Sequence, residues 1–268
     1  MPNLQQVIAL RKKYDSQQPI SDSADSNSLE KQGIYEELEK AITVKHIGPL
    51  LEHVIPREEY FSITDESLSS SIINYFEEQK EENVVLLFID ITNFSRKTSG
   101  FSPKRITTIL DRYYRQLMPI IYRNGGEIEK IMGDGIICIF GEPFLKGLST
   151  RRKYIKAERC ARDVIVKFKD SDFEVKVALH SGSIMYYKTP TEYYEEYTMI
   201  GNTLTELYRL ESVSQSNGIN FFEDRGYDLE SEYATGGINL ARNYWQGTSM
   251  RHNLQGLGYR TIKALIRK

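Results

Sequence analysis

Two aspartates stand where apolar strands are expected to end, and carboxylates in such places can bind a metal ion. Asp90 lies near the end of residues 84–91, whose continuous apolar, β-branched character predicts a strand buried on both faces. Asp134 lies in the tight-turn sequence Gly133-Asp134-Gly135. Singly, each is more simply a strand-end cap or a hairpin residue. Together, on adjacent strands, they can converge on one point, and divalent cations that carry phosphate ligands are typically held by one or two carboxylates.

The hydrophobic pattern predicts the elements that would position these aspartates. Ser102 and Pro103 form an N-cap and a first-turn proline, which open a helix with one apolar face. The order β-α-β-β-α-β followed by αβ predicts an α+β fold, with a ferredoxin-like sheet and helices packed on one of its faces. The remaining expected elements are two strands within residues 125–141, a helix at about 150–169, strands at 173–179, 193–201 and 218–222, and a helix at about 202–213.

Changes in composition and hydrophobic pattern along the chain predict three parts. Residues 1–80 are expected to form an N-terminal helical and linker extension, residues 81–225 the main domain, and residues 226–268 a C-terminal extension that packs on it. Residues 67–79 read as a helix, and the closing residues 259–268 also read as helical.

Composition excludes several classes of protein. The 268 residues include 35 Lys and Arg against 37 Asp and Glu, and the net charge of −2 argues against a general nucleic-acid binder. No segment is long and apolar enough for stable membrane insertion and no signal peptide is recognisable, so a cytoplasmic location is expected. Cys138 and Cys160 fit neither a disulfide framework nor a structural zinc site.

Three motifs in sequence give the chain a family resemblance. They are FIDITNFS at residues 88–95, GGEIEKIMGDG at 125–135, and YTMIGNT at 197–203 with Arg-Leu-Glu at 209–211. In this order and spacing the chain resembles the class III nucleotidyl cyclases over about residues 84–222. The resemblance implies a homodimer with two active sites at its interface. Each site would use two divalent metal ions, Mn²⁺ or Mg²⁺, to convert a nucleoside triphosphate to a 3′,5′-cyclic monophosphate and pyrophosphate.

The resemblance also assigns ligands for the metals and the triphosphate. Asp90 and Asp134 match the two metal-binding aspartates, and the Ile91 carbonyl would complete the shell of the first metal. The phosphate oxygens would be cradled by backbone amides in the turn that follows the strand, those of Thr92, Asn93, Phe94 and Ser95.

Four further residues correspond to positions that contact the base, the ribose or the α-phosphate. Lys130 and Thr198 match the pair that reads the base edge from the partner subunit, and Arg209 matches an arginine that stabilises charge on the α-phosphate. Without the motifs, Lys130 would be a solvated strand lysine and Arg209 a helix-surface arginine paired with Glu206. Thr205 replaces the asparagine that is usual four residues before this arginine, so the usual ribose contact must change.

Other departures narrow the resemblance. Ser183 stands where some relatives have a phosphate-binding arginine. His180, three residues earlier, is expected to be a buried histidine at the end of a strand. With Thr205, these features look most like the pyrimidine cyclases of bacterial Pycsar antiphage systems. That likeness implies cyclic UMP or cyclic CMP as product, with UTP preferred, and a separate effector protein that binds it.

Two alternatives stay open. A lysine and threonine pair can satisfy acceptors on adenine, uracil or cytosine alike, so an adenylate cyclase fits the same residues. A catalytically silent dimer that binds nucleotide and acts as a regulatory module also fits, because the usual asparagine is missing.

Overall fold

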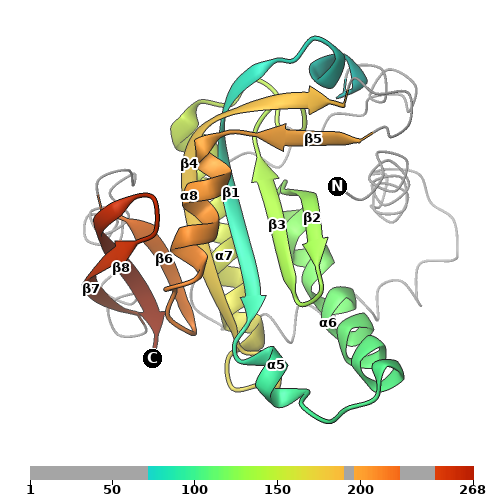
Figure 1. Cartoon of the computed structure of the whole chain (residues 1–268), viewed down its shortest axis with the longest axis vertical. Coiled ribbons are helices and arrows are strands. Elements are labelled where there is room, and N and C mark those ends of the chain that lie inside the picture. Colours follow the sequence, from blue (N-terminus) through green and yellow to red (C-terminus); the bar gives the residue numbers. More distant parts are fainter. Residues whose placement is uncertain (1–71, 190–195, 224–244) are drawn as a thin grey trace, which may run out of the picture.

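The computed structural model describes residues 72–189, 196–223 and 245–268 (Figure 1). Most of the predicted N-terminal extension lies outside these residues. Within them, eight strands form one sheet in the order β2-β3-β1-β4-β6-β8-β7, and β5 also pairs with β4. The strands are β1 (Glu81–Ile91), β2 (Glu127–Met132), β3 (Gly135–Phe140), β4 (Val175–Lys188), β5 (Tyr197–Ile200), β6 (Gly218–Phe222), β7 (Trp245–Leu254) and β8 (Gly258–Arg267).

The strand β1 lies inside the sheet and is antiparallel to both of its neighbours, β3 and β4. Its side chains alternate between two faces, as pleated strands require. Leu87 and Ile89 join one hydrophobic core, whereas Leu86 and Phe88 join the other. The predicted burial of this strand on both faces is therefore confirmed, and the two cores hold the end that carries Asp90.

Helices cover both faces of the sheet. They are α5 (Phe94–Lys97), α6 (Pro103–Arg123), α7 (Thr150–Phe168) and α8 (Asn202–Glu211). As predicted, the Ser102 hydroxyl caps α6 by accepting from the N–H of Arg105. Helices α6 and α7 pack into the core that contains Leu87, while α8 packs into the opposite core (Figure 1). The expectation of helices on one face is wrong in this respect, because β1 is apolar on both faces and each needs cover. No helix in the described ranges has the length and hydrophobicity for crossing a bilayer.

The predicted α+β order is confirmed from β1 to β4, with α6 and α7 as the two connecting helices. Of the helix expected at residues 67–79, the structure describes residues 72–79, which are helical at 72–77 and form a turn at 78–79. Phe76 from this segment is buried against Tyr186 of β4, with ring centroids 4.9 Å apart. The segment that precedes β1 therefore contributes to the core that also receives α8.

The end of the chain is a β-hairpin, so the helix expected at residues 259–268 is wrong. Strand β8 pairs with β6 on one side and with β7 on the other. Gly256 and Gly258, at φ values of 79° and 71°, turn the chain between β7 and β8. In β8, Ile262 enters one core and Leu265 the other, which requires the alternation of a strand. Pairing with β6 decides between strand and helix for this short apolar segment.

The connection from β4 to β6 places the end of α8 beside the end of β1. Strands β4 and β6 are parallel, and α8 lies in the connection between them. After α8, residues 212–217 return to the sheet and are fixed by Asn220, which is completely buried. Its side-chain oxygen accepts from the N–H of Gln215 at 2.8 Å, and its side-chain amide donates to the Val177 carbonyl at 3.1 Å.

Candidate active site

The ends of β1 and the β2–β3 turn bring Asp90 and Asp134 into contact. Antiparallel pairing of β1 with β3 runs to Ile89 and Ile136, and the two carboxyl groups are hydrogen-bonded to each other. A Cβ atom at Gly135 would lie 2.7 Å from the Phe88 ring and 3.4 Å from a carboxylate oxygen of Asp90. The missing side chain at Gly135 therefore lets the turn approach the end of β1.

The environment of the pair favours one bound proton. Burial, and next the negative charge of Asp134, raise the pKa of Asp90 to about 6. Burial also raises the pKa of Asp134, although the hydrogen bond with Asp90 acts in the opposite direction. The pair therefore binds a proton more readily than two separate, solvated aspartates would. Above about pH 6 the site gains negative charge and becomes a stronger attractor of cations.

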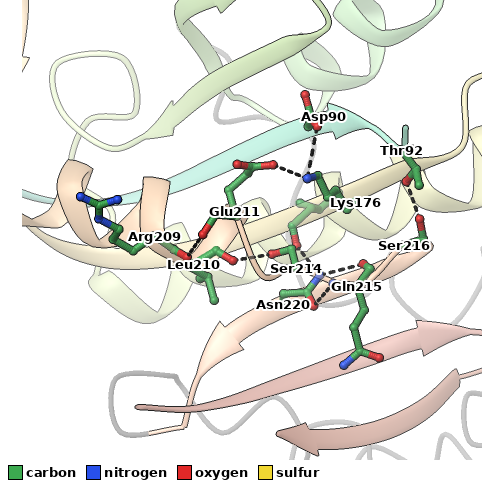
Figure 2. Close-up of polar contacts among 12 residues, drawn as sticks. Asp90, Thr92, Lys176, Arg209, Leu210, Glu211, Ser214, Gln215, Ser216 and Asn220 are labelled. Carbon is green, nitrogen blue, oxygen red and sulfur yellow. Dashed lines mark hydrogen bonds and ion pairs between the residues drawn. The ribbon is translucent and has the colours of Figure 1, made fainter. Parts of the chain in front are cut away.

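A lysine on the neighbouring strand partly compensates this charge. Lys176 is the cross-strand partner of Asp90 in the β1–β4 ladder. Its Nζ lies 3.4 Å from Asp90 Oδ2 and 2.5 Å from Glu211 Oε1 at the end of α8 (Figure 2). The sequence motifs assign no role in the site to Lys176. One feature of the sequence could have indicated such a role. Lys176 is a charged residue within a strand that was predicted to be buried and to lie beside the strand of Asp90.

The turn after β1 presents backbone amides next to the aspartates. The N–H of Thr92 donates to the Glu174 carbonyl at 2.8 Å, and its hydroxyl is hydrogen-bonded to that of Ser216 (Figure 2). Asn93 adopts a left-handed conformation, at φ 58°, before α5 begins. The amides of Asn93, Phe94 and Ser95 donate no hydrogen bond to any residue that the structure describes, as expected where a helix begins.

Helix α8 holds the two other predicted catalytic residues, but not at the aspartate pair of the same chain. Leu207 and Leu210 are fully buried against the sheet, whereas Thr205 is exposed and Arg209 is half-buried. The Arg209 guanidinium points away from the Asp90 carboxylate (Figure 2). Within the described part of the chain, it forms no ion pair with an acidic side chain.

The possible pairing of Arg209 with Glu206 is not formed. The Glu206 carboxylate instead lies 2.7 Å from Nε2 of His180. His180 is only 1% exposed, and its ring packs edge-on to Phe222 at 5.2 Å between centroids. His180 is thus the buried histidine that the sequence predicts, and its bond to Glu206 fixes α8 on β4.

The predicted base-reading residues lie on two other strands. Lys130 is a half-buried residue of β2, directly after an irregularity in its pairing with β3. Thr198 is a half-buried residue of β5, opposite Tyr187 of β4. Among the described residues, neither side chain forms a hydrogen bond to Asp90 or Asp134.

The donor atoms at the aspartate pair suit hard divalent cations. Across residues 72–189, 196–223 and 245–268, no group of three or more His, Cys, Asp or Glu side chains could hold a metal ion. A cation at Asp90 and Asp134 would therefore take its other ligands from backbone carbonyls, water or a phosphate. Mg²⁺ is commonly bound in this way, through one or two carboxylates and substrate phosphates.

Comparison with known proteins identifies a catalytic-domain family. Residues 76–235, more than half of the chain, match the family described as the adenylate and guanylate cyclase catalytic domain. Adenylate cyclase 1 of Rhizobium meliloti is 22% identical over 147 residues, which cover 51% of this chain and 22% of that protein. The chain spans about a fifth of the length of the first such relatives.

Solved structures show the same fold. The adenylyl cyclase CyaB from P. aeruginosa superposes with a TM-score of 0.55 at 17% identity, covering 71% of this chain and 96% of that one. The guanylate cyclase domain of RhGC from Catenaria anguillulae, in complex with GTP, has a TM-score of 0.54 at 21% identity and covers 70% and 100%. At these identities the likeness establishes the fold alone.

The raised pKa of Asp90 predicts that this residue destabilises the metal-free protein at neutral pH. Its folded pKa of about 6 lies above the unfolded value, so the stability it contributes is complete below about pH 4 and is lost as pH rises through 6. In EDTA, Asp90→Asn should therefore raise the free energy of unfolding by about 1–3 kcal/mol at pH 7, with little effect at pH 4.

Urea unfolding across pH 4–8 would measure this difference. Asp111→Asn, at an exposed position of α6, is the matched control and should follow the wild-type profile. A difference in the free energy of unfolding between wild type and Asp90→Asn that does not change with pH would contradict the raised pKa of Asp90.

Proposed function

Because the chain belongs to the adenylate and guanylate cyclase catalytic domain family, we propose that it converts a nucleoside triphosphate to the 3′,5′-cyclic monophosphate and pyrophosphate. The observation that carries this proposal is the contact between the Asp90 and Asp134 carboxyl groups. Two partly buried carboxylates side by side destabilise a fold unless a proton or cation compensates them. They add nothing to either hydrophobic core, which is typical of a functional site.

Two divalent cations, Mg²⁺ or Mn²⁺, are the proposed cofactors at this pair, with the Ile91 carbonyl as a further ligand. When bound, such ions activate the ribose 3′-hydroxyl and neutralise charge on the leaving pyrophosphate. The chain's own part is to orient the substrate. Amides at 93–95 would hold phosphate oxygens, so that the 3′-hydroxyl attacks the α-phosphorus in line with the leaving group.

A homodimer with composite sites is the proposed assembly. The direction of Arg209, away from Asp90 in its own chain, supports a role in the site of a partner subunit. Ile200 and Tyr208, on β5 and α8, are 46% and 37% exposed despite their size. Large apolar side chains at the surface are typical of an association face. Lys130 and Thr198 would then read the base from the second chain.

A pyrimidine triphosphate is the proposed substrate, with UTP ahead of CTP. Thr205 replaces the usual ribose-contacting asparagine and is exposed on α8, where a substrate could meet it. Tyr208 packs edge-on against Phe88, two residues before Asp90, at 5.6 Å between ring centroids. This bulk beside the aspartates favours a one-ring base. The cyclic product would be a second messenger for a separate effector in antiphage defence, as the resemblance to Pycsar cyclases implies.

The proposed catalytic unit is residues 81–225, with the extensions at 1–80 and 226–268 on either side. The hairpin of β7 and β8 completes the sheet next to β6, so this part of the C-terminal extension packs directly on the proposed unit.

Incubation of the purified protein with Mn²⁺ and each of the four ribonucleoside triphosphates tests the activity, with the product identified by mass spectrometry. Asp90→Ala and Asp134→Ala should each lower turnover by about 10² or more, because each removes a group that stabilises the transition state through bound cations. Asp111→Ala is the control and should keep wild-type turnover. Near-normal turnover in either site variant, in a folded dimer, would refute the two-metal assignment.

Subunit mixing tests the composite site. Arg209→Ala and Asp90→Ala should both be inactive as homodimers, whereas a mixture should recover about a quarter of wild-type activity, because half of the random dimers hold one complete site. Native mass spectrometry would establish that heterodimers form. A mixture that contains heterodimers but remains inactive would place both residues in one site of a single chain.

Competition among nucleotides tests the substrate. We expect UTP or CTP to be converted at least about tenfold faster than ATP or GTP, because a pocket closed around one ring excludes two rings sterically. The measurement is the product distribution from an equimolar mixture. Cyclic AMP as the main product would overturn the pyrimidine assignment and leave the cyclase assignment intact, whereas nucleotide binding without any cyclic product would favour the regulatory dimer.

A further inference from the structure

The ion pair between Lys176 of β4 and Glu211 at the end of α8 suggests how the aspartates stay available to bind a cation. We propose that Glu211 is a positioning residue that holds the Lys176 ammonium away from Asp90, and that this pair sets the affinity of the aspartates for divalent cations. The inference rests on the proposed function, because it concerns the same aspartate pair. It adds a control of cation binding through two residues that need not touch substrate or metal.

The two distances give the direction of the effect. Lys176 Nζ lies 2.5 Å from Glu211 Oε1 but 3.4 Å from Asp90 Oδ2, so its main bond is to Glu211. All three side chains are largely shielded, at 21%, 21% and 16% exposure for Lys176, Asp90 and Glu211. Charges so close together in shielded surroundings interact more strongly than surface pairs do.

The position of Glu211 is itself fixed by the fold. It is the last residue of α8, and the carbonyls of the preceding turn are capped by the hydroxyls of Ser212 and Ser214, at 2.8 and 2.9 Å. The following residues are fixed to the sheet by Asn220 (Figure 2). A lysine near a helix C-terminus is further favoured by the helix dipole. Glu211 therefore draws the ammonium towards α8 from a fixed point.

Without Glu211, the ammonium has the aspartates as its next acceptors. Lys176 is the cross-strand partner of Asp90, so its side chain cannot leave this end of the sheet. It would then pair fully with Asp90 and compete with a divalent cation for the same oxygens. Without Lys176, by contrast, the aspartates lose their compensating charge and Glu211 becomes a third free carboxylate.

The two substitutions should therefore change cation affinity in opposite directions. The probe is Mn²⁺ alone, added to the metal-free full-length protein and followed by electron paramagnetic resonance of the free ion. Glu211→Gln should weaken binding by about tenfold, and Lys176→Met should strengthen it by about threefold or more, from the charge that each removes. The double variant Lys176→Met/Glu211→Gln and the charge-keeping Lys176→Arg should both stay within about threefold of wild type.

A matched pair at the other end of β1 provides the control. Lys80 and Glu78 form an ion pair of 2.9 Å there, so Lys80→Met and Glu78→Gln remove the same charges far from the aspartates and should leave Mn²⁺ binding unchanged. Circular dichroism would establish that each variant is folded.

Three outcomes would overturn the inference. If Glu211→Gln and Lys176→Met shift affinity in the same direction, or if neither shifts it while wild type binds Mn²⁺ and Asp90→Ala does not, the pair is only a structural bond. If wild type itself fails to bind more Mn²⁺ than Asp90→Ala does, the proposed two-metal function is wrong, and the inference is overturned with it.

Discussion

Everything around the site depends on holding two carboxylates in contact in a half-buried position. Such a contact is unfavourable by itself, because burial penalises charge and like charges repel. It persists here because the atoms that carry it are fixed from both sides of the sheet. Asp90 ends a strand buried in two cores, and Asp134 lies in a tight turn that approaches it closely at Gly135. The packing of the two cores therefore offsets the unfavourable energy of the carboxylate pair. In a less tightly packed fold the two side chains would move apart.

The two helical layers make different contributions to this arrangement. Helices α6 and α7 cover one face and belong to the larger core, with no residue assigned to chemistry. Helix α8 covers the other face, where it packs into the second hydrophobic core and also contacts the residues beside the aspartates. Its buried leucines fix it on the sheet, its His180–Glu206 bond fixes its middle, and Glu211 at its end contacts Lys176. A small shift of α8 would thus move the charge next to the aspartates.

The hairpin at the end of the chain extends this support. Strand β8 pairs with β6, the strand that carries Asn220, and Asn220 fixes the segment that follows α8. Strand β7 reaches the same segment through a bond of 3.0 Å between Gln215 and Thr248. The turn after β1 is tied to it as well, through the hydroxyls of Thr92 and Ser216. Segments far apart in sequence therefore converge on residues 212–217, which directly follow Glu211.

The sequence alone determined the strands and helices whose patterns are long and regular. The apolar run that ends at Asp90, the cap at Ser102 and the tight turn at residues 133–135 each have a local physical cause, so each could be predicted. In that turn the positive φ lies at Gly133, at 63°, and not in the Asp-Gly pair that the pattern indicated. The convergence of Asp90 and Asp134 also followed from sequence, since adjacent strands were expected. The motifs added a family that the comparison with known proteins supports at the level of the catalytic domain.

Only the tertiary structure decided the features that depend on which segments become neighbours. The face covered by α8 follows from the need to bury both sides of β1, and strand rather than helix at the chain end follows from pairing with β6. The role of Lys176 depends on its register opposite Asp90 and on the return of α8 to that point. Local pattern gives a residue its element and its face, whereas register and long-range packing choose its partners, which lie too far away in sequence for pattern to reveal.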